Sequence, residues 1–222
     1  MIIKTFQTLV SILVFASLPS IANANVIYQD LHLIPQFAKV HGIVMGVAFV
    51  IVFPLGSLLI RALRTKGSTW IHATWQLLGW VLMVAGLATG IRLGKIINLL
   101  HNNTHTILGT VIVVLMLIQP FIGFVHHRRF LATQQHGTWT HVHVWFGRTL
   151  ILLGIINGGL GLQLAGNTKA GTIVYGVVAG LVGAACFSMV VFVEARKRNQ
   201  QVDARETSSE TGAEERSKKC TP

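Results

Sequence analysis

Charged residues are scarce in this 222-residue sequence, and acidic residues are the scarcest. Asp, Glu, Lys and Arg make up 11% of the chain, and only seven residues are acidic, almost all in the N-terminal segment or the C-terminal tail. Soluble domains carry about 25% charged residues. Because 52% of the residues are apolar, a water-soluble protein is excluded, and no pair of carboxylates is available for acid–base catalysis.

Cysteine frameworks and phosphate-binding loops are missing as well. The two cysteines, Cys186 in an apolar run and Cys220 near the C-terminus, give neither a disulfide framework nor a thiolate metal site. No glycine-rich loop follows a strand, which argues against a nucleotide site. The net charge of +11 comes from Lys and Arg residues that lie between apolar runs. They predict membrane topology, not a nucleic-acid partner.

The N-terminus has the pattern of a signal peptide over residues 1–24. Lys4 precedes an apolar stretch, and Ala22-Asn23-Ala24 supplies a small-residue cleavage site. An uncleaved anchor helix is the alternative. In either case the short segment 25–39 is delivered to the exoplasmic side, and it is too short to hold a further domain.

Five long apolar runs follow, and each can cross about 30 Å of hydrocarbon as a helix. They define a transmembrane domain over residues 40–198, and we expect an all-α membrane protein. The last segment, 199–222, is rich in Ser, Thr, Glu and Lys, so we expect a disordered cytosolic tail. The predicted spans are residues 42–60, 73–91, 106–125, 144–165 and 172–193.

The charges in the loops give the orientation. Eight Lys and Arg residues lie near the membrane in the segments around 61–69, 126–142 and from 194 onward, against four on the other side. The positive-inside rule therefore puts these segments in the cytosol, in agreement with the signal peptide. We expect a multi-pass protein of the secretory pathway, at the plasma membrane or an endomembrane, with an exoplasmic N-terminus and a cytosolic C-terminus.

Four of the ten histidines begin a span each. His41 and His105 fall near the outer edge, and His72 and His143 near the inner edge. Burying an ionisable group is costly unless it is paired or ligated, and two facing imidazoles in each leaflet would ligate two haems, one above the other. The alternative for each histidine is an ordinary interfacial position. His141 lies two residues from His143 and points to a different helix face, so only one of the two can be the ligand.

Glycines follow these histidines at helical spacing. In the fourth span they lie on the face that starts at His143, which favours His143 over His141. Either helix–helix contact or room for a flat macrocycle explains them. The glycines are Gly147, Gly154, Gly158 and Gly161, with Gly79, Gly86 and Gly90 after His72 and Gly109 after His105.

Four blocks of sequence, taken in order, resemble the cytochrome b-561 family, in its fungal stand-alone or DOMON-linked form with a ferric reductase-like transmembrane domain. The resemblance covers about residues 38–195. It implies a central four-helix bundle with two haem b groups, ligated by His41 with His105 and by His72 with His143. The blocks are His41-Gly42 with Phe53-Pro54-Leu55-Gly56, His72 with Gln76-Leu77-Leu78-Gly79, His105 with Gln119-Pro120 and His126-His127, and His143-Val144-Trp145-Phe146-Gly147-Arg148 with Asn157-Gly158-Gly159-Leu160.

The resemblance also implies an oxidoreductase that moves single electrons from a cytosolic donor, ascorbate, to an exoplasmic acceptor such as monodehydroascorbate or a ferric chelate. Two alternatives stay open: a haem-bearing anchor that relays electrons to a separate redox protein, and a haem-free transporter or structural protein. A homodimer is compatible with all three. The cations available to haem propionates or anionic substrates, or simply to membrane anchoring, are Lys39, Arg64, Lys66, Arg92, Lys95 and Arg148.

Overall fold

The computed structural model describes residues 28–63, 65, 67–100, 102–135 and 137–219, and the predicted signal peptide lies outside these residues. The described residues form helices and connecting turns, with no strand among them. Five of the helices are long and apolar enough to cross a membrane. The prediction of an all-α, multi-pass membrane protein is therefore confirmed. The helical spans are Asp30–Ala62, Ser68–Ile96, Thr104–Thr133, Thr138–Leu164 and Lys169–Arg205.

The first span is one continuous rod built from different kinds of helix. A 3₁₀ segment, η1 (Tyr28–Leu33), leads into α2 (Ile34–Gly46), a π-helical segment, η2 (Val47–Val52), and α3 (Phe53–Ala62). Proline lacks an N–H group and its ring clashes with the carbonyl four residues earlier. The wider π turn directly before Pro54 accommodates that conflict without breaking the span.

The next three spans are single helices, α4 (Ser68–Ile96), α5 (Thr104–Thr133) and α6 (Thr138–Leu164). The side chain of Asn103 caps α5 by accepting a hydrogen bond of 2.8 Å from the backbone N–H of His105. This cap fixes where the helix starts, and so fixes the depth of His105.

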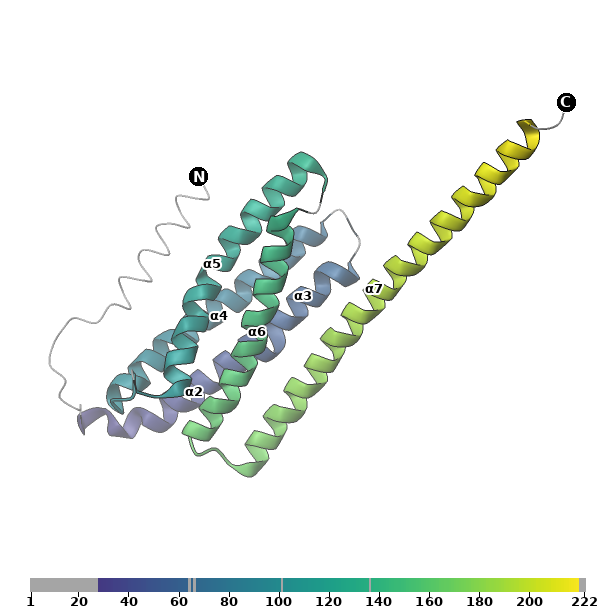
Figure 1. Ribbon diagram of the computed structural model, residues 1–222. Helices are drawn as coiled ribbons and strands as arrows, with labels where there is room; N and C mark the ends of the chain where they lie inside the picture. Colours follow the sequence, from purple (N-terminus) through teal and green to yellow (C-terminus); the bar gives the residue numbers. More distant parts are fainter. Residues whose placement is uncertain (1–27, 64, 66, 101, 136, 220–222) are drawn as a thin grey trace.

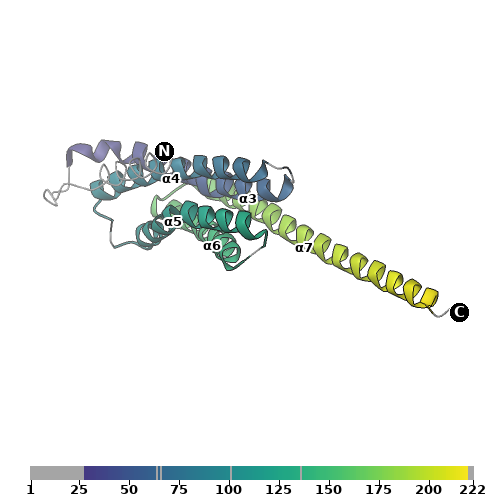
Figure 2. The same ribbon diagram turned by 90° about the horizontal axis from the view of Figure 1, so that it is seen from above.

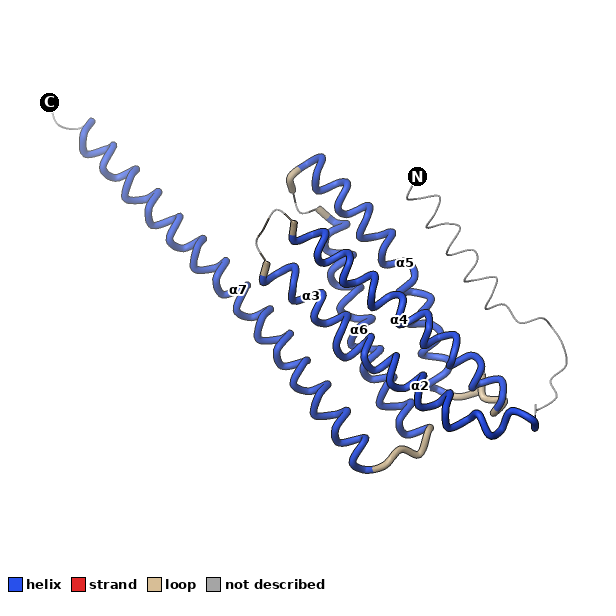
Figure 3. The backbone as a smooth tube through the Cα atoms, turned by 180° about the vertical axis from the view of Figure 1, so that it is seen from behind, coloured by secondary structure: helices blue, strands red, loops and turns tan. Residues whose placement is uncertain are grey.

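The helices form two layers beside a separate fifth helix. Figures 1 and 2 show α2, α3 and α4 in one layer and α5 and α6 in the other, with α7 (Lys169–Lys219) along the side of the bundle and extending well past its end. Figure 3 shows the same arrangement from behind, where short loops join the helices. This is a central four-helix bundle with a peripheral helix.

An apolar core lies in the middle of the bundle, where all four spans meet. Met83, Ile112 and Leu150 have at most 2% of their surface exposed. The outer surface is apolar too, and no residue of the most apolar stretch of α7 is buried. An apolar exterior of this kind faces lipid. The buried cluster consists of Ala48, Phe49, Phe53, Trp80, Met83, Ile112, Val113, Met116 and Leu150.

The structure differs from the sequence-based expectation at the C-terminus. In place of a disordered tail from residue 199, the backbone of α7 continues as a helix to Lys219. The segment is rich in Glu, Arg, Lys, Ala and Gln, which have favourable helix propensity, and it contains no proline before Pro222. Because the span already supplies a helical nucleus, continuing the helix requires no new nucleation.

Candidate functional site

The first pair of predicted ligands meets at one end of the bundle. His41 comes from α2 and His105 from the first turn of α5. Their ring centroids lie 5.9 Å apart, and the ring planes are nearly perpendicular, at 81°. The structure therefore brings together two side chains that are 64 residues apart in the sequence, as the topology predicts.

The second pair lies at the opposite end, where α4 and α6 begin. His72 belongs to the first turns of α4 and His143 to those of α6, and the two are electrostatic neighbours. The ring of His126, from α5, is stacked on that of His143, with centroids 6.0 Å apart and an interplanar angle of 18°. His141, by contrast, is exposed.

Backbone carbonyls of neighbouring helices orient three of these four rings. In each case the Nδ1–H donates a hydrogen bond and the Nε2 atom is left facing away from that carbonyl. In a metal-ligating histidine, a hydrogen bond from the ring nitrogen that does not bind the metal fixes the tautomer. The bonds run from His41 to the oxygen of Gly86 at 2.8 Å, from His72 to Gly56 at 2.7 Å and from His105 to Asn157 at 2.9 Å.

The glycines make room for these rings. A Cβ atom on Gly90 would lie 2.7 Å from His41, one on Gly161 would lie 2.7 Å from His105, and one on Gly123 would lie 3.0 Å from His143. Most of the other glycines in the predicted stripes contact a side chain of a neighbouring helix in the same way. These distances support close helix contact, the first of the two explanations above, and room for a macrocycle stays a prediction.

The spacing of His41 and His105 suits a haem iron. Metal–imidazole bonds are about 2.0–2.1 Å long, so an iron atom needs two ring nitrogens about 4 Å apart. A centroid separation of 5.9 Å between His41 and His105 is compatible with that spacing. With Nδ1 bonded to a backbone carbonyl, the imidazoles of His41, His72 and His105 offer Nε2 as the ligand atom.

The predicted cations have different surroundings. Arg92 forms an ion pair with Asp30 at 2.5 Å, which ties α4 to η1. The guanidinium of Arg148 lies 4.9 Å from the ring centroid of Trp145, so a cation–π contact stabilises this charge within the fourth span. Lys39 is exposed and Lys95 is half-buried. Arg64 and Lys66 lie outside the described residues.

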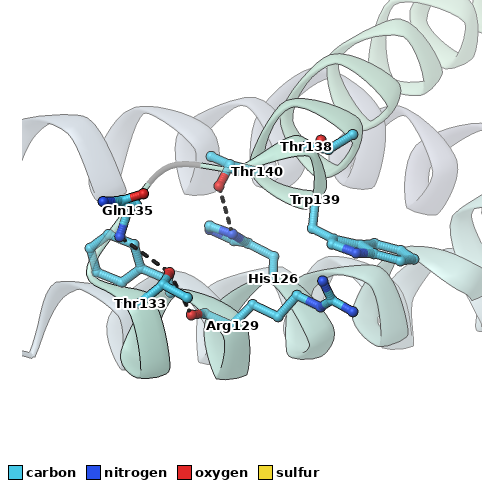
Figure 4. A pocket seen from close by; sticks show the side chains of 9 residues that line it. His126, Arg129, Thr133, Gln135, Thr138, Trp139 and Thr140 are labelled. Carbon is cyan, nitrogen blue, oxygen red and sulfur yellow. Dashed lines mark hydrogen bonds between the residues drawn. The ribbon is translucent and has the colours of Figure 1, made fainter.

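A cavity of about 340 Å³ opens between the end of α5 and the start of α6, at the end that holds His72 and His143. Its wall includes His126, whose Nδ1 is hydrogen bonded to the hydroxyl of Thr140 at 3.0 Å. Arg129 lies 5.7 Å from the ring centroid of Trp139. As Figure 4 shows, these side chains line a small polar chamber. The ring of His126 belongs both to this chamber and to the stack with His143.

Sequence reasoning missed some of these features. The apolar pattern predicts a loop at His126, whereas α5 extends to Thr133 and the ring of His126 is stacked on that of His143. The carbonyl partners and the buried amide of Gln119 were also missed. The paired His126-His127 directly after an apolar run is the one sequence signal that could have pointed to the first of these.

The fold and the paired histidines fit a class of protein, the helical membrane bundles that carry electrons on haem. The chain belongs to the eukaryotic cytochrome b561 family, whose model matches residues 40–167. It is thus an integral membrane protein of a family that binds b-type haem and transfers electrons across membranes. No solved structure matches the chain.

The curated relatives are cytochrome b561 and DOMON domain-containing proteins of Arabidopsis thaliana. One is 31% identical over 172 residues, which cover 72% of this chain and 42% of the relative. A second is 29% identical over 141 residues, 62% of this chain and 35% of the relative. The chain therefore spans less than half the length of the relatives it matches.

Proposed function

We propose that the protein transfers electrons across the membrane through two b-type haems. His41 and His105 would hold the outer haem, and His72 and His143 the inner one. The observation that carries this proposal is the orientation of the histidines at the two ends of one bundle, with Nδ1 bound to a helix carbonyl in three of the four. When bound, each haem supplies a reversible one-electron carrier.

Ligation by two histidines explains why such a site would carry electrons. If two histidines held each haem iron, as proposed for His41 with His105 and for His72 with His143, no position would remain for oxygen, and the site would favour electron transfer. The chain contributes ligand orientation, burial and spacing. A site at each end of the bundle divides the hydrocarbon thickness, about 30 Å, into two shorter transfers.

The donor we propose is ascorbate, entering from the cytosol. The positive-inside rule supports a cytosolic position for the end with His72 and His143. The chamber beside His126 supports an anionic donor there, since Arg129 offers a positive charge and Thr133, Thr138 and Thr140 offer hydroxyl groups. Arg64 and Lys66, just before His72 in the sequence, would add to the attraction. The exoplasmic acceptor would be monodehydroascorbate or a ferric chelate.

A second candidate is a haem-bearing anchor that passes electrons to a separate redox protein. The names of the relatives support it, because they join cytochrome b561 with a DOMON domain. In that case the chain would need no substrate chamber of its own.

Proteoliposomes with ascorbate sealed inside and a ferric chelate outside test the proposal. We expect ferric reduction only by molecules whose His72–His143 end faces the interior. Neutralising Arg64 and Lys66 together should slow haem reduction and leave the haem spectrum unchanged, and added salt should slow it as well. Equal reduction from either face, or no reduction by ascorbate alone, would support the relay instead.

Arg129→Gln and Arg128→Gln form a matched pair for the chamber. Both variants remove one positive charge from the same turn of α5, but only Arg129 lines the chamber, whereas Arg128 lies over Phe124. We expect Arg129→Gln to raise the ascorbate concentration needed for half-maximal reduction several-fold and Arg128→Gln to leave it nearly unchanged. Equal effects would mean that only the overall surface charge attracts the donor.

A further inference from the structure

Gln119 is a buried polar residue in the apolar interior of the bundle. It lies in α5, and only 8% of its surface is exposed. Neither its side-chain oxygen nor its side-chain nitrogen has a hydrogen-bond partner among the described residues. A buried amide without hydrogen-bond partners lowers the stability of the folded state, and such groups are rare in native proteins.

The position of Gln119 relates it to one pair of histidines. On α5 it comes one turn before Gly123, the residue that contacts the ring of His143. On α6 it lies beside Gly147, one turn after His143, where a Cβ atom would be 3.6 Å from the Gln119 nitrogen. The amide is therefore within about one helical turn of His143 along both helices, on the side toward the membrane centre.

A second glutamine at the same end shows what a satisfied amide looks like here. Gln76 comes one turn after His72 and donates from Nε2 to the carbonyl oxygen of Phe53 at 3.2 Å. The described residues thus provide a partner for one of the two amides beside the inner histidines and none for the other. An apolar side chain at position 119 would avoid that penalty, so the amide requires a reason to be there.

We propose that the Gln119 amide is a contact for the inner haem and raises its reduction potential, an inference that rests on the two-haem function proposed above. A haem offers hydrogen-bond acceptors, namely its propionate oxygens and its π face, and no strong donors. The amide would therefore donate through its N–H. Reduction adds one electron to the haem, so a nearby N–H dipole stabilises the reduced form more than the oxidised form.

Redox titration of the purified holoprotein tests this inference. Gln119→Met keeps an unbranched side chain and removes the amide. We expect the midpoint potential of one haem component to fall, by a change of about threefold to tenfold in the equilibrium constant for reduction, where tenfold is 59 mV for one electron. The other component should stay in place. The component that moves should be the one lost in His143→Ala.

Thr149→Val is the control, because it removes a polar group from α6 close to Gly147, the residue beside Gln119. Thr149 is exposed on α6, and its hydroxyl donates to the carbonyl of its own helix at Trp145, so neither potential should move. Gln119→Leu is a second variant of different shape. Met and Leu at this position should lower the potential to the same extent, because both remove the same N–H group.

Three results would overturn the inference: unchanged potentials in Gln119→Met, equal shifts of both components, or opposite shifts in the Met and Leu variants, which would indicate packing. If Gln119→Met loses haem altogether, the titration of Gln119→Leu decides. Failure of the two-haem proposal is seen separately, because a wild-type protein with fewer than two haems contradicts it before any variant is made.

Discussion

The four histidines at the ends of the spans are held differently, and the difference bears on their roles. His41, His72 and His105 each donate from Nδ1 to a carbonyl of another helix. The Nδ1 of His143 is buried without a partner among the described residues, and its ring is stacked on His126. We therefore expect the orientation of His143 to depend on its stacking contact and on Gly123 more than on a hydrogen bond.

Replacing single histidines should separate the two haems. His72→Ala or His143→Ala should remove one spectral component, and His41→Ala or His105→Ala should remove the other, because each pair lies at its own end of the bundle. Optical difference spectra of folded, purified variants provide the measurement. The pairing is wrong if His41→Ala and His72→Ala abolish the same component and spare the other.

Gly161 should be intolerant of a side chain. Gly161→Ala would place a Cβ atom 2.7 Å from the ring of His105, and overpacking of this kind costs about 1–3 kcal/mol. We expect weaker retention of the outer haem and a lower Tm. Gly159→Ala, two residues earlier on α6 with nothing within 4 Å of the new atom, is the control and should retain haem as the wild type does. Similar losses in both variants would contradict the account.

At the scale of elements, a hydrogen bond from a side chain of α4 holds the π-helical segment η2 against that helix. The indole N–H of Trp75 donates to the carbonyl oxygen of Val52 at 2.8 Å. Trp75 comes one turn after His72. The same stretch of α4 therefore carries both this hydrogen bond and a predicted haem ligand.

Trp75→Phe tests this hydrogen bond, since it removes the indole N–H and keeps an aromatic ring. A hydrogen bond contributes about 0.5–1.5 kcal/mol, so the Tm should fall by a few degrees and the inner haem should be held more weakly. Trp70→Phe is the matched control, because Trp70 lies on the same helix with 72% of its surface exposed. Thermal unfolding followed at the haem absorption gives the Tm of each variant. Equal Tm changes in the two variants would argue against a stabilising hydrogen bond from Trp75.

The sequence predicts the elements well because each span carries its own signal. Apolar runs of membrane length indicate all five helices, and the start of each run gives the depth of His41, His72, His105 and His143. The π segment, the carbonyl partners and the contact of His126 were not predictable in this way. They depend on how helices distant in the sequence rotate against one another, and periodicity within one helix does not encode that rotation.

The C-terminal tail shows a different limit. Its polar composition predicts disorder because it cannot bury an apolar face. Composition does not register that the segment continues a helix that has already nucleated in the preceding span. The backbone follows that continuity as far as Lys219.

For the whole molecule, the account requires that the bundle hold a carrier at each end, and the number of haems per chain tests this most directly. A pyridine haemochrome assay on purified protein, divided by the protein mass from quantitative amino-acid analysis, measures that number. Two matched pairs of histidines predict a ratio near two, with haem b as the only type. A ratio near one would remove one pair, and a ratio of zero in folded, haem-supplied protein would contradict the account.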